Sequence, residues 1–187
     1  MTYLGMQILI EGLALSAFGL IRDLAKNPLA SALNAYVMQD ESRHVAFGRL
    51  SLRDYYPTLT DSERKEREQF VVEACYHMRD RFLGEEVWQN LGLPVDRCIE
   101  YVENSEIMRE YRKMLFTRIV PTIKDIGLWG PKVQKAFRDM GVYEMAAFDI
   151  DALMKADEDQ AESLDQSHAE MASRALEVDQ AIAAGAS

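Results

Sequence analysis

The sequence predicts an all-α protein with one main domain, and three observations support this fold class. Hydrophobic residues make up 48% and charged residues 28% of the 187 positions, which is ordinary for a globular chain with a sizeable core. The helix-favouring residues Ala, Leu, Glu, Arg and Met are abundant, whereas Val and Thr are few. Apolar residues recur at helical spacing between breaks that contain Pro or Gly, and no segment shows strand-type alternation.

The first two predicted helices span about residues 2–25 and 29–55. Lys26-Asn27-Pro28 separates them, because Asn suits a helix cap and Pro cannot continue the hydrogen-bond ladder. Pro is nevertheless tolerated in the first turn of the helix that follows. Tyr56-Pro57-Thr58 then ends the second helix. The two helices are therefore expected to form an antiparallel hairpin.

The later helices are expected, in order, over residues 62–90, 94–103, 105–125 and 132–140, and the segment 94–103 is expected to be a short helix or a turn. A capping signal, Thr60 followed by Glu63, precedes the first of these. Pro121 is expected to kink the third one, and Pro131 to begin the fourth.

Two parts of different charge are predicted. Residues 1–148 are expected to be a helical domain, and residues 149–187 an acidic, Ala-rich C-terminal helix or partly disordered tail. The tail holds ten acidic residues against two basic ones, a balance of −8, so −2 of the total −10 belongs to residues 1–148. Neither part offers a basic face, which argues against nucleic acid or an anionic membrane as a partner.

The N-terminal run Tyr3–Ile21 is apolar enough to raise the question of a membrane span. Glu11 lies near its centre, where a carboxylate costs roughly 3 kcal/mol in a bilayer. The run also lacks the basic flank of a secretory signal. A helix inside a bundle is the better interpretation. Cys75 and Cys98 form no Cys-x-x-Cys pattern and fit reduced thiols, so a cytoplasmic location is expected.

The strongest chemical signal lies on the second predicted helix. Glu41 and His44 are three residues apart, so they share one helical face and can reach a single metal ion. Glu11 lies thirty residues earlier (41 − 11 = 30) in an apolar run, where an acid needs a partner such as a metal. A set of oxygen ligands with one imidazole suits iron or manganese better than structural zinc. The expected metal ligands are therefore Glu11, Glu41 and His44.

Simpler interpretations stand beside this one. The pair on the second helix could be a chance spacing on an exposed face, and Glu11 could form an ion pair with Arg22. Glu73 and His77 are four residues apart and are expected to be solvated or salt-bridged rather than metal ligands. His168, in the acidic tail, is expected at the surface.

Asp-Glu-x-Arg-His at residues 40–44, followed by Val-Ala-Phe-Gly, with Glu11 upstream on an apolar helix, resembles the ferritin-like di-iron carboxylate superfamily. Its relatives include the ribonucleotide reductase small subunit, its ligand-binding oxidase homologues, the acyl carrier protein desaturases and the arylamine N-oxygenases. The resemblance covers residues 7–50 and implies a ferritin-like helical bundle. The full site of that superfamily combines two copies of Glu plus Glu-x-x-His, one from each half of the bundle. This chain is similar to the second half.

The resemblance also implies roles for two residues beside the ligands. Asp40 matches the acid that orients a His of the opposite half, and Arg43 could pair with such an acid in return; neither is expected to touch the metal. The sequence holds no second Glu-x-x-His. Val37 occupies the place where the arylamine N-oxygenases carry an additional His. The chain is thus expected to supply a half-bundle and a half-site.

Two explanations remain open for the absent half. It could belong to a missing N-terminal segment, or a second copy of the chain could pair about a two-fold axis. In the second case a homodimer is expected, with Asp40 of one chain bonding His44 of the other.

The function expected from the resemblance is a di-iron oxidase or oxygenase that uses O₂ to oxidise a small organic substrate. Iron is the expected cofactor, with manganese possible, and the electron donor is not identifiable from the sequence. The substrate is expected in the apolar space near Ala14, Phe18, Val37 and Gly48. One alternative is a ferritin-like protein that binds and oxidises iron. The other is a metal-free helical interaction module.

Overall fold

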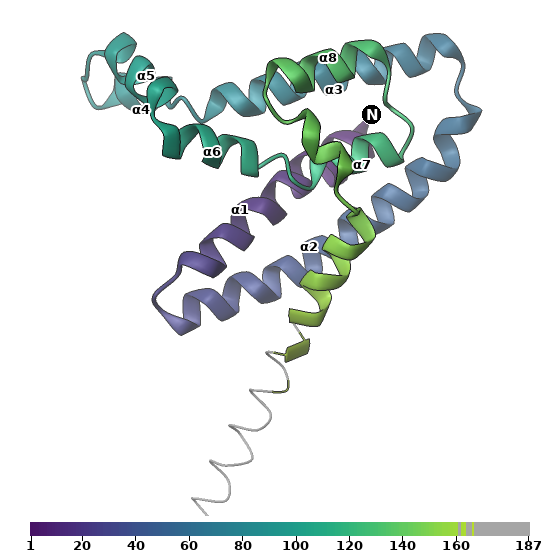
Figure 1. Ribbon diagram of the computed structural model, residues 1–187, viewed down its shortest axis with the longest axis horizontal. Helices are drawn as coiled ribbons and strands as arrows, with labels where there is room; N and C mark the ends of the chain where they lie inside the picture. Colours follow the sequence, from purple (N-terminus) through teal and green to yellow (C-terminus); the bar gives the residue numbers. More distant parts are fainter. Residues whose placement is uncertain (161, 164–165, 167–187) are drawn as a thin grey trace, which may run out of the picture.

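The computed structural model describes residues 1–160, 162–163 and 166, and every regular element in this part is helical (Figure 1). The all-α class is therefore confirmed. The elements are, in order, η1 (Leu4–Ile10), α1 (Glu11–Leu24), α2 (Pro28–Tyr55), η2 (Tyr56–Thr58), α3 (Asp61–Arg81), α4 (Glu85–Asn90), α5 (Val95–Asn104), α6 (Glu106–Met114), α7 (Ile119–Asp125), α8 (Pro131–Asp139) and η3 (Tyr143–Ala147). Residues 150–160 form a further helix. The first of these elements is a π-helix, and η2 and η3 are 3₁₀-helices.

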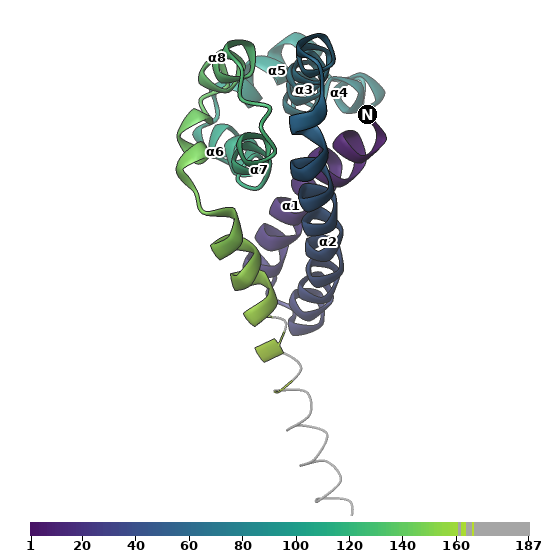
Figure 2. The ribbon, with the colours of Figure 1, turned by 90° about the vertical axis from the view of Figure 1, so that its right-hand side faces the viewer.

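The first two helices form the predicted antiparallel hairpin, in which η1 and α1 run against α2 (Figures 1 and 2). The turn between them is fixed by local chemistry. The side chain of Asn27 accepts a hydrogen bond from the backbone N–H of Leu29 at 2.9 Å, and Pro28 occupies the first helical position. The capping box at Thr60 and Glu63 is also present, at the start of α3.

The prediction of one helix over residues 62–90 is wrong. α3 ends at Arg81, and α4 begins separately at Glu85. Gly84 between them has a φ of 73°, a left-handed conformation that Gly adopts without strain. A right-handed α-helix cannot continue through a residue in this conformation, so the helix ends before it.

The prediction of one kinked helix over residues 105–125 is also wrong. α6 ends at Met114 and α7 begins at Ile119, so the four residues 115–118 separate the two helices. Pro121 lies in the first turn of α7, where its missing N–H would have no partner in any case. The chain therefore breaks upstream of Pro121 instead of bending at it, and the hydroxyl of Thr117 donates to the carbonyl of Met114 within the break.

The main core lies where η1, α3, α7 and α8 meet. Its largest buried side chains are Tyr56, Phe116 and Phe137. α1 approaches this core closely at Gly12, where a Cβ atom would lie 3.3 Å from the side chain of Ile119. The hairpin is thus held on one side by the core, and its other side faces away from it.

A buried arginine joins α2 to the C-terminal part of the described chain. Arg49 is 3% exposed, and its Nε donates to Asp125 Oδ2 at 2.6 Å while its Nη1 donates to Asp151 Oδ1 at 2.5 Å. A second tie, Arg118 Nη2 to Asp157 Oδ1 at 2.7 Å, lies further along the same C-terminal helix. The start of the predicted acidic tail is therefore a helix docked by ion pairs. His168 and residues 167–187 lie outside the described residues.

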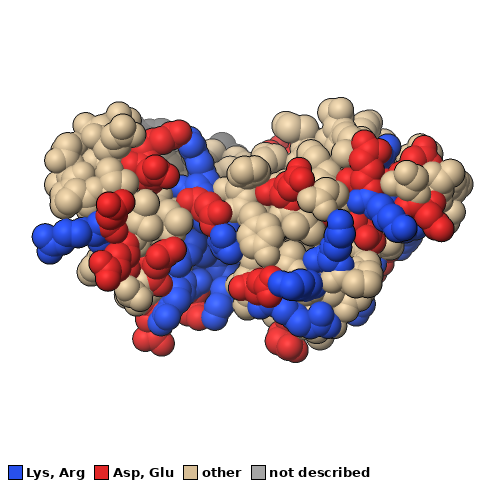
Figure 3. Space-filling model, turned by 90° about the horizontal axis from the view of Figure 1, so that it is seen from above, with Lys and Arg blue, Asp and Glu red and all other residues tan. Residues whose placement is uncertain are grey.

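Exposed apolar side chains occur both on the hairpin and on the later helices. Side chains of both signs cover the end formed by the later helices, as the view from above shows (Figure 3). In the hairpin, the helix over Leu4–Leu24 is long and apolar enough to span a membrane. Its most apolar window has a mean hydropathy of 1.8, yet only 28% of that window is buried.

Replacing Arg49 tests the docking of the C-terminal helix. We expect Arg49→Leu to lower the free energy of unfolding by about 1–3 kcal/mol, because two charge-assisted hydrogen bonds are lost while the freed carboxylates can be hydrated. Urea denaturation followed by circular dichroism measures this change. Arg53→Leu is the matched control, since Arg53 is 44% exposed and lies 3.9 Å from Asp125. Equal losses in the two variants would contradict the anchoring role of Arg49.

Candidate metal centre

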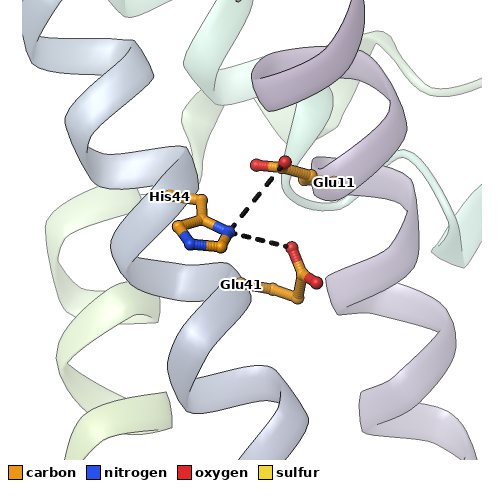
Figure 4. Close-up of side chains that lie close together, drawn as sticks. All are labelled: Glu11, Glu41 and His44. Atoms are coloured by element: carbon orange, nitrogen blue, oxygen red, sulfur yellow. Dashed lines mark ion pairs between the residues drawn. The ribbon is translucent and has the colours of Figure 1, made fainter.

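The three predicted ligands lie together between α1 and α2 (Figure 4). His44 Nδ1 lies 3.5 Å from Glu41 Oε2 and 4.0 Å from Glu11 Oε1. One ligand atom from each residue falls within 4.8 Å of the others. The helical spacing of Glu41 and His44 thus gives the shared face expected from the sequence, and the hairpin brings Glu11 to it.

Glu11 stands at the junction between two kinds of helix. Its backbone N–H bonds to the carbonyl of Met6, five residues earlier, as in a π-helix, and α1 begins at Glu11 itself. π-helical turns are rare in proteins, but those that occur are often found at functional sites. The turn therefore sets the direction from which this carboxylate enters the space between the helices.

One oxygen of each carboxylate, Oε2 of Glu11 and Oε2 of Glu41, is buried without a hydrogen bond. Burial raises the pKa of Glu11, the nearby Glu41 carboxylate raises it further, and His44 partly opposes this shift. Two partly buried like charges with an imidazole beside them are a group that a bound cation would stabilise. The donor set, two carboxylates and one neutral imidazole nitrogen, fits iron or manganese.

One side of the site faces away from the protein. The side chain of His44 is 57% exposed, whereas those of Glu11 and Glu41 are 21% and 26% exposed. Asp40 and Arg43 lie beside the site on α2 and pair with each other, with Arg43 Nη1 donating to Asp40 Oδ1 at 3.4 Å. Their side chains are 73% and 64% exposed, so they lie at the open edge of the site.

The structure bears on two of the simpler interpretations, the pairing of Glu11 with Arg22 and the solvated state of Glu73 and His77. Arg22 pairs with Asp23 at 2.8 Å rather than with Glu11. Glu73 accepts a hydrogen bond from Gln69 on the same helix at 2.8 Å, and His77 is exposed on α3. Among the described residues, one cluster of acidic, His or Cys side chains is compact enough to hold a metal, and it is the predicted one.

Gln7 is a residue of this region that the sequence did not single out. Its Oε1 is buried without a hydrogen-bond partner, and a Cβ atom at Gly48 would lie 2.7 Å from it. Gln7 thus fills space at Gly48 that was expected to hold substrate. Phe18, also expected beside substrate, packs against the small cluster of Leu15, Met38 and Val45. The sequence signal that could have identified Gln7 is its position as a polar residue in an apolar run, one helical turn before Glu11.

Comparisons with protein-family models, with curated proteins and with solved structures find no match to this chain. The resemblance to the di-iron carboxylate superfamily therefore stays a prediction from residues 7–50. The geometry of the three side chains stands independently of it.

Glu11→Gln tests the electrostatic state of the site without metal. We expect this variant to raise the stability of the metal-free protein at pH 7 by about 1 kcal/mol, the scale of a like-charge contact at this separation in a hydrated site. Because the pKa of Glu11 is raised in the folded state, its protonated form stabilises the fold. That contribution is fully present below the ordinary pKa and is lost as the pH rises through the raised one.

Thermal unfolding of the metal-free protein between pH 4 and pH 8 measures this effect. The wild-type chain should lose stability relative to Glu11→Gln across the lower part of this range. Glu100→Gln, at an exposed position on α5, is the control and should leave the stability unchanged. A destabilised Glu11→Gln protein would show that the carboxylate makes a favourable contact with the protein.

Proposed function

We propose that this chain is an O₂-dependent oxidoreductase of the di-iron carboxylate type, with a ferritin-like helical bundle of which the α1–α2 hairpin is one half. Glu11, Glu41 and His44 would hold the metal. The observation that carries this proposal is the pair of buried carboxylate oxygens, on Glu11 and Glu41, that have no hydrogen-bond partner and lie beside an imidazole.

Iron bound here, or manganese in its place, would supply redox chemistry with O₂. The chain's own residues have separate tasks. Glu11 and Glu41 supply negative charge in a partly dry space, where each charge acts more strongly than in water. Glu11 must lose its proton to bind a cation, so its raised pKa makes metal affinity increase with pH. His44 supplies the nitrogen donor from the open edge of the site.

The open edge favours a second candidate, the oxidation of Fe²⁺ itself as substrate. His44 is 57% exposed, so a short path leads from solvent to the ligands, whereas Gln7 fills the space at Gly48. A small hydrated cation can use such a path directly. An organic substrate would need an apolar cavity that includes the ligands.

Metal binding and O₂ consumption test the proposal on the full chain. Anaerobic calorimetric titration with Fe²⁺ should show binding to the wild-type protein and at least tenfold weaker binding to Glu11→Ala and His44→Ala. Admitting O₂ to the Fe²⁺-loaded protein should then consume O₂ faster than the same Fe²⁺ in buffer. His77→Ala removes an exposed imidazole on α3 and is the matched control, expected to behave as wild type.

The amount of Fe²⁺ oxidised separates the two candidates. Turnover of many Fe²⁺ ions per chain without an added reductant supports iron oxidation. O₂ consumption that requires an electron donor after the first equivalents supports the oxygenase. Absence of Fe²⁺ binding in a folded wild-type protein would refute both and favour a metal-free interaction module.

A further inference from the structure

The hairpin has an outer face that is apolar although it is exposed. We call this the open face and define it by the large side chains that flank the metal ligands: Tyr3, Ile10 and Ile21 on η1 and α1, and Leu29, Leu33 and Phe47 on α2. They are between 47% and 74% exposed. The rings of Tyr3 and Phe47 lie 6.2 Å apart, so this face is continuous across the two helices.

The metal ligands lie in the middle of the open face. His44 and Phe47 are three residues apart, and Leu33 lies eleven residues before His44, which is three helical turns. Ile10 and Ile21 have the same eleven-residue spacing on the other helix. Apolar side chains therefore extend on both sides of an exposed imidazole, and each of its two carboxylate neighbours has one buried oxygen without a hydrogen bond.

A membrane is a poor occupant for such a face. Asp40, one helical turn before His44, places a largely exposed carboxylate beside the imidazole, and Arg43 pairs with it. Each charged group costs roughly 3 kcal/mol at the centre of a bilayer. The occupant must instead combine apolar flanks with a polar centre that supplies donor atoms to a metal.

A second copy of this chain has that combination. A two-fold axis through the centre of the face would place each set of apolar flanks against the other and bring the two ligand sets together. The helix over Leu4–Leu24 is 21 residues long. A face of two such helices is about 32 Å long and about 20 Å wide, or roughly 600 Å², close to the ~800 Å² that each partner contributes to a stable interface.

We infer that two copies of this chain pair through their open faces and complete one metal centre with Glu11, Glu41 and His44 from each. This inference rests on the proposed function, because it names the partner of the same site. Four carboxylates and two imidazoles then surround the metal ions, a donor set that one chain cannot supply. Asp40, one helical turn before His44, would accept a hydrogen bond from the imidazole of the second copy in such a pair, which would fix the tautomer of that ligand.

Solution mass and metal pairing test the inference together. Light scattering over a range of protein concentrations should give twice the 21.3 kDa of one chain for the wild type. The double variant Leu33→Asp/Phe47→Asp should give the mass of one chain, because it places charge on both flanks without altering a ligand. Ile107→Asp, at an 80% exposed position on α6, is the control and should remain dimeric. Circular dichroism melting should show that both variants are folded.

Mn²⁺ serves as the probe of the shared centre. In the wild-type dimer, electron paramagnetic resonance should show two spin-coupled Mn²⁺ ions per two chains, as expected for ions about 4 Å apart. The monomeric double variant should bind Mn²⁺ at least tenfold more weakly and show an uncoupled signal.

The outcomes separate the inference from the proposed function. A dimer that the double variant dissociates but that binds no metal would support the pairing and refute the metal proposal. A wild-type monomer that binds metal as tightly at every protein concentration would overturn the pairing and leave the metal proposal standing. A wild-type monomer that instead attaches to neutral lipid vesicles, or that requires a different polypeptide to cover the open face, would also overturn it.

Discussion

Two carboxylates held close together between α1 and α2 are the constraint on which the rest of the structure depends. Their repulsion and partial burial work against folding, and nothing in the described chain neutralises them except an imidazole at 3.5 to 4.0 Å. The rest of the fold must therefore hold the hairpin in place. It does so with the core behind Gly12 and with the ion pairs of Arg49. Functional sites commonly lower the stability of the fold, because the groups that chemistry requires are unfavourable for folding.

The sequence predicts the helix starts well where their cause is local. Pro28 and Pro131 begin helices, and Thr60 caps one, because the relevant bonds lie within a few residues. The ends of long helices were predicted less well. The breaks after Arg81 and Met114 depend on a left-handed Gly and on how α6 and α7 pack, and hydrophobic periodicity records neither.

In the candidate site, too, features with a local cause could be predicted and features that depend on tertiary packing could not. Helical spacing places Glu41 beside His44, and a short turn between two apolar helices brings Glu11 to them, so the three residues could be found from the sequence. The role of Gln7 and the openness of the site could not. Both depend on which neighbour fills the space at Gly48 and on which helix face the later elements cover. These are properties of tertiary packing, in which a residue's exposure is set by elements far away in the chain.

The π-helix before Glu11 has a consequence for how this region tolerates changes of length. A π-helix holds one more residue in each hydrogen-bonded loop than an α-helix. Deleting one residue from Leu4–Ile10 could be absorbed by conversion to α-helix, which would leave Glu11 and everything after it in register. Because the π-helix accommodates one residue more than an α-helix over the same rotation, the residues before the deletion would keep their place around the helix axis, and Tyr3 would stay beside Phe47. The same deletion after Glu11 would misalign the carboxylate and the core together. The π-helical segment is thus the part of the hairpin that can lose one residue without moving the ligands or the surface before it.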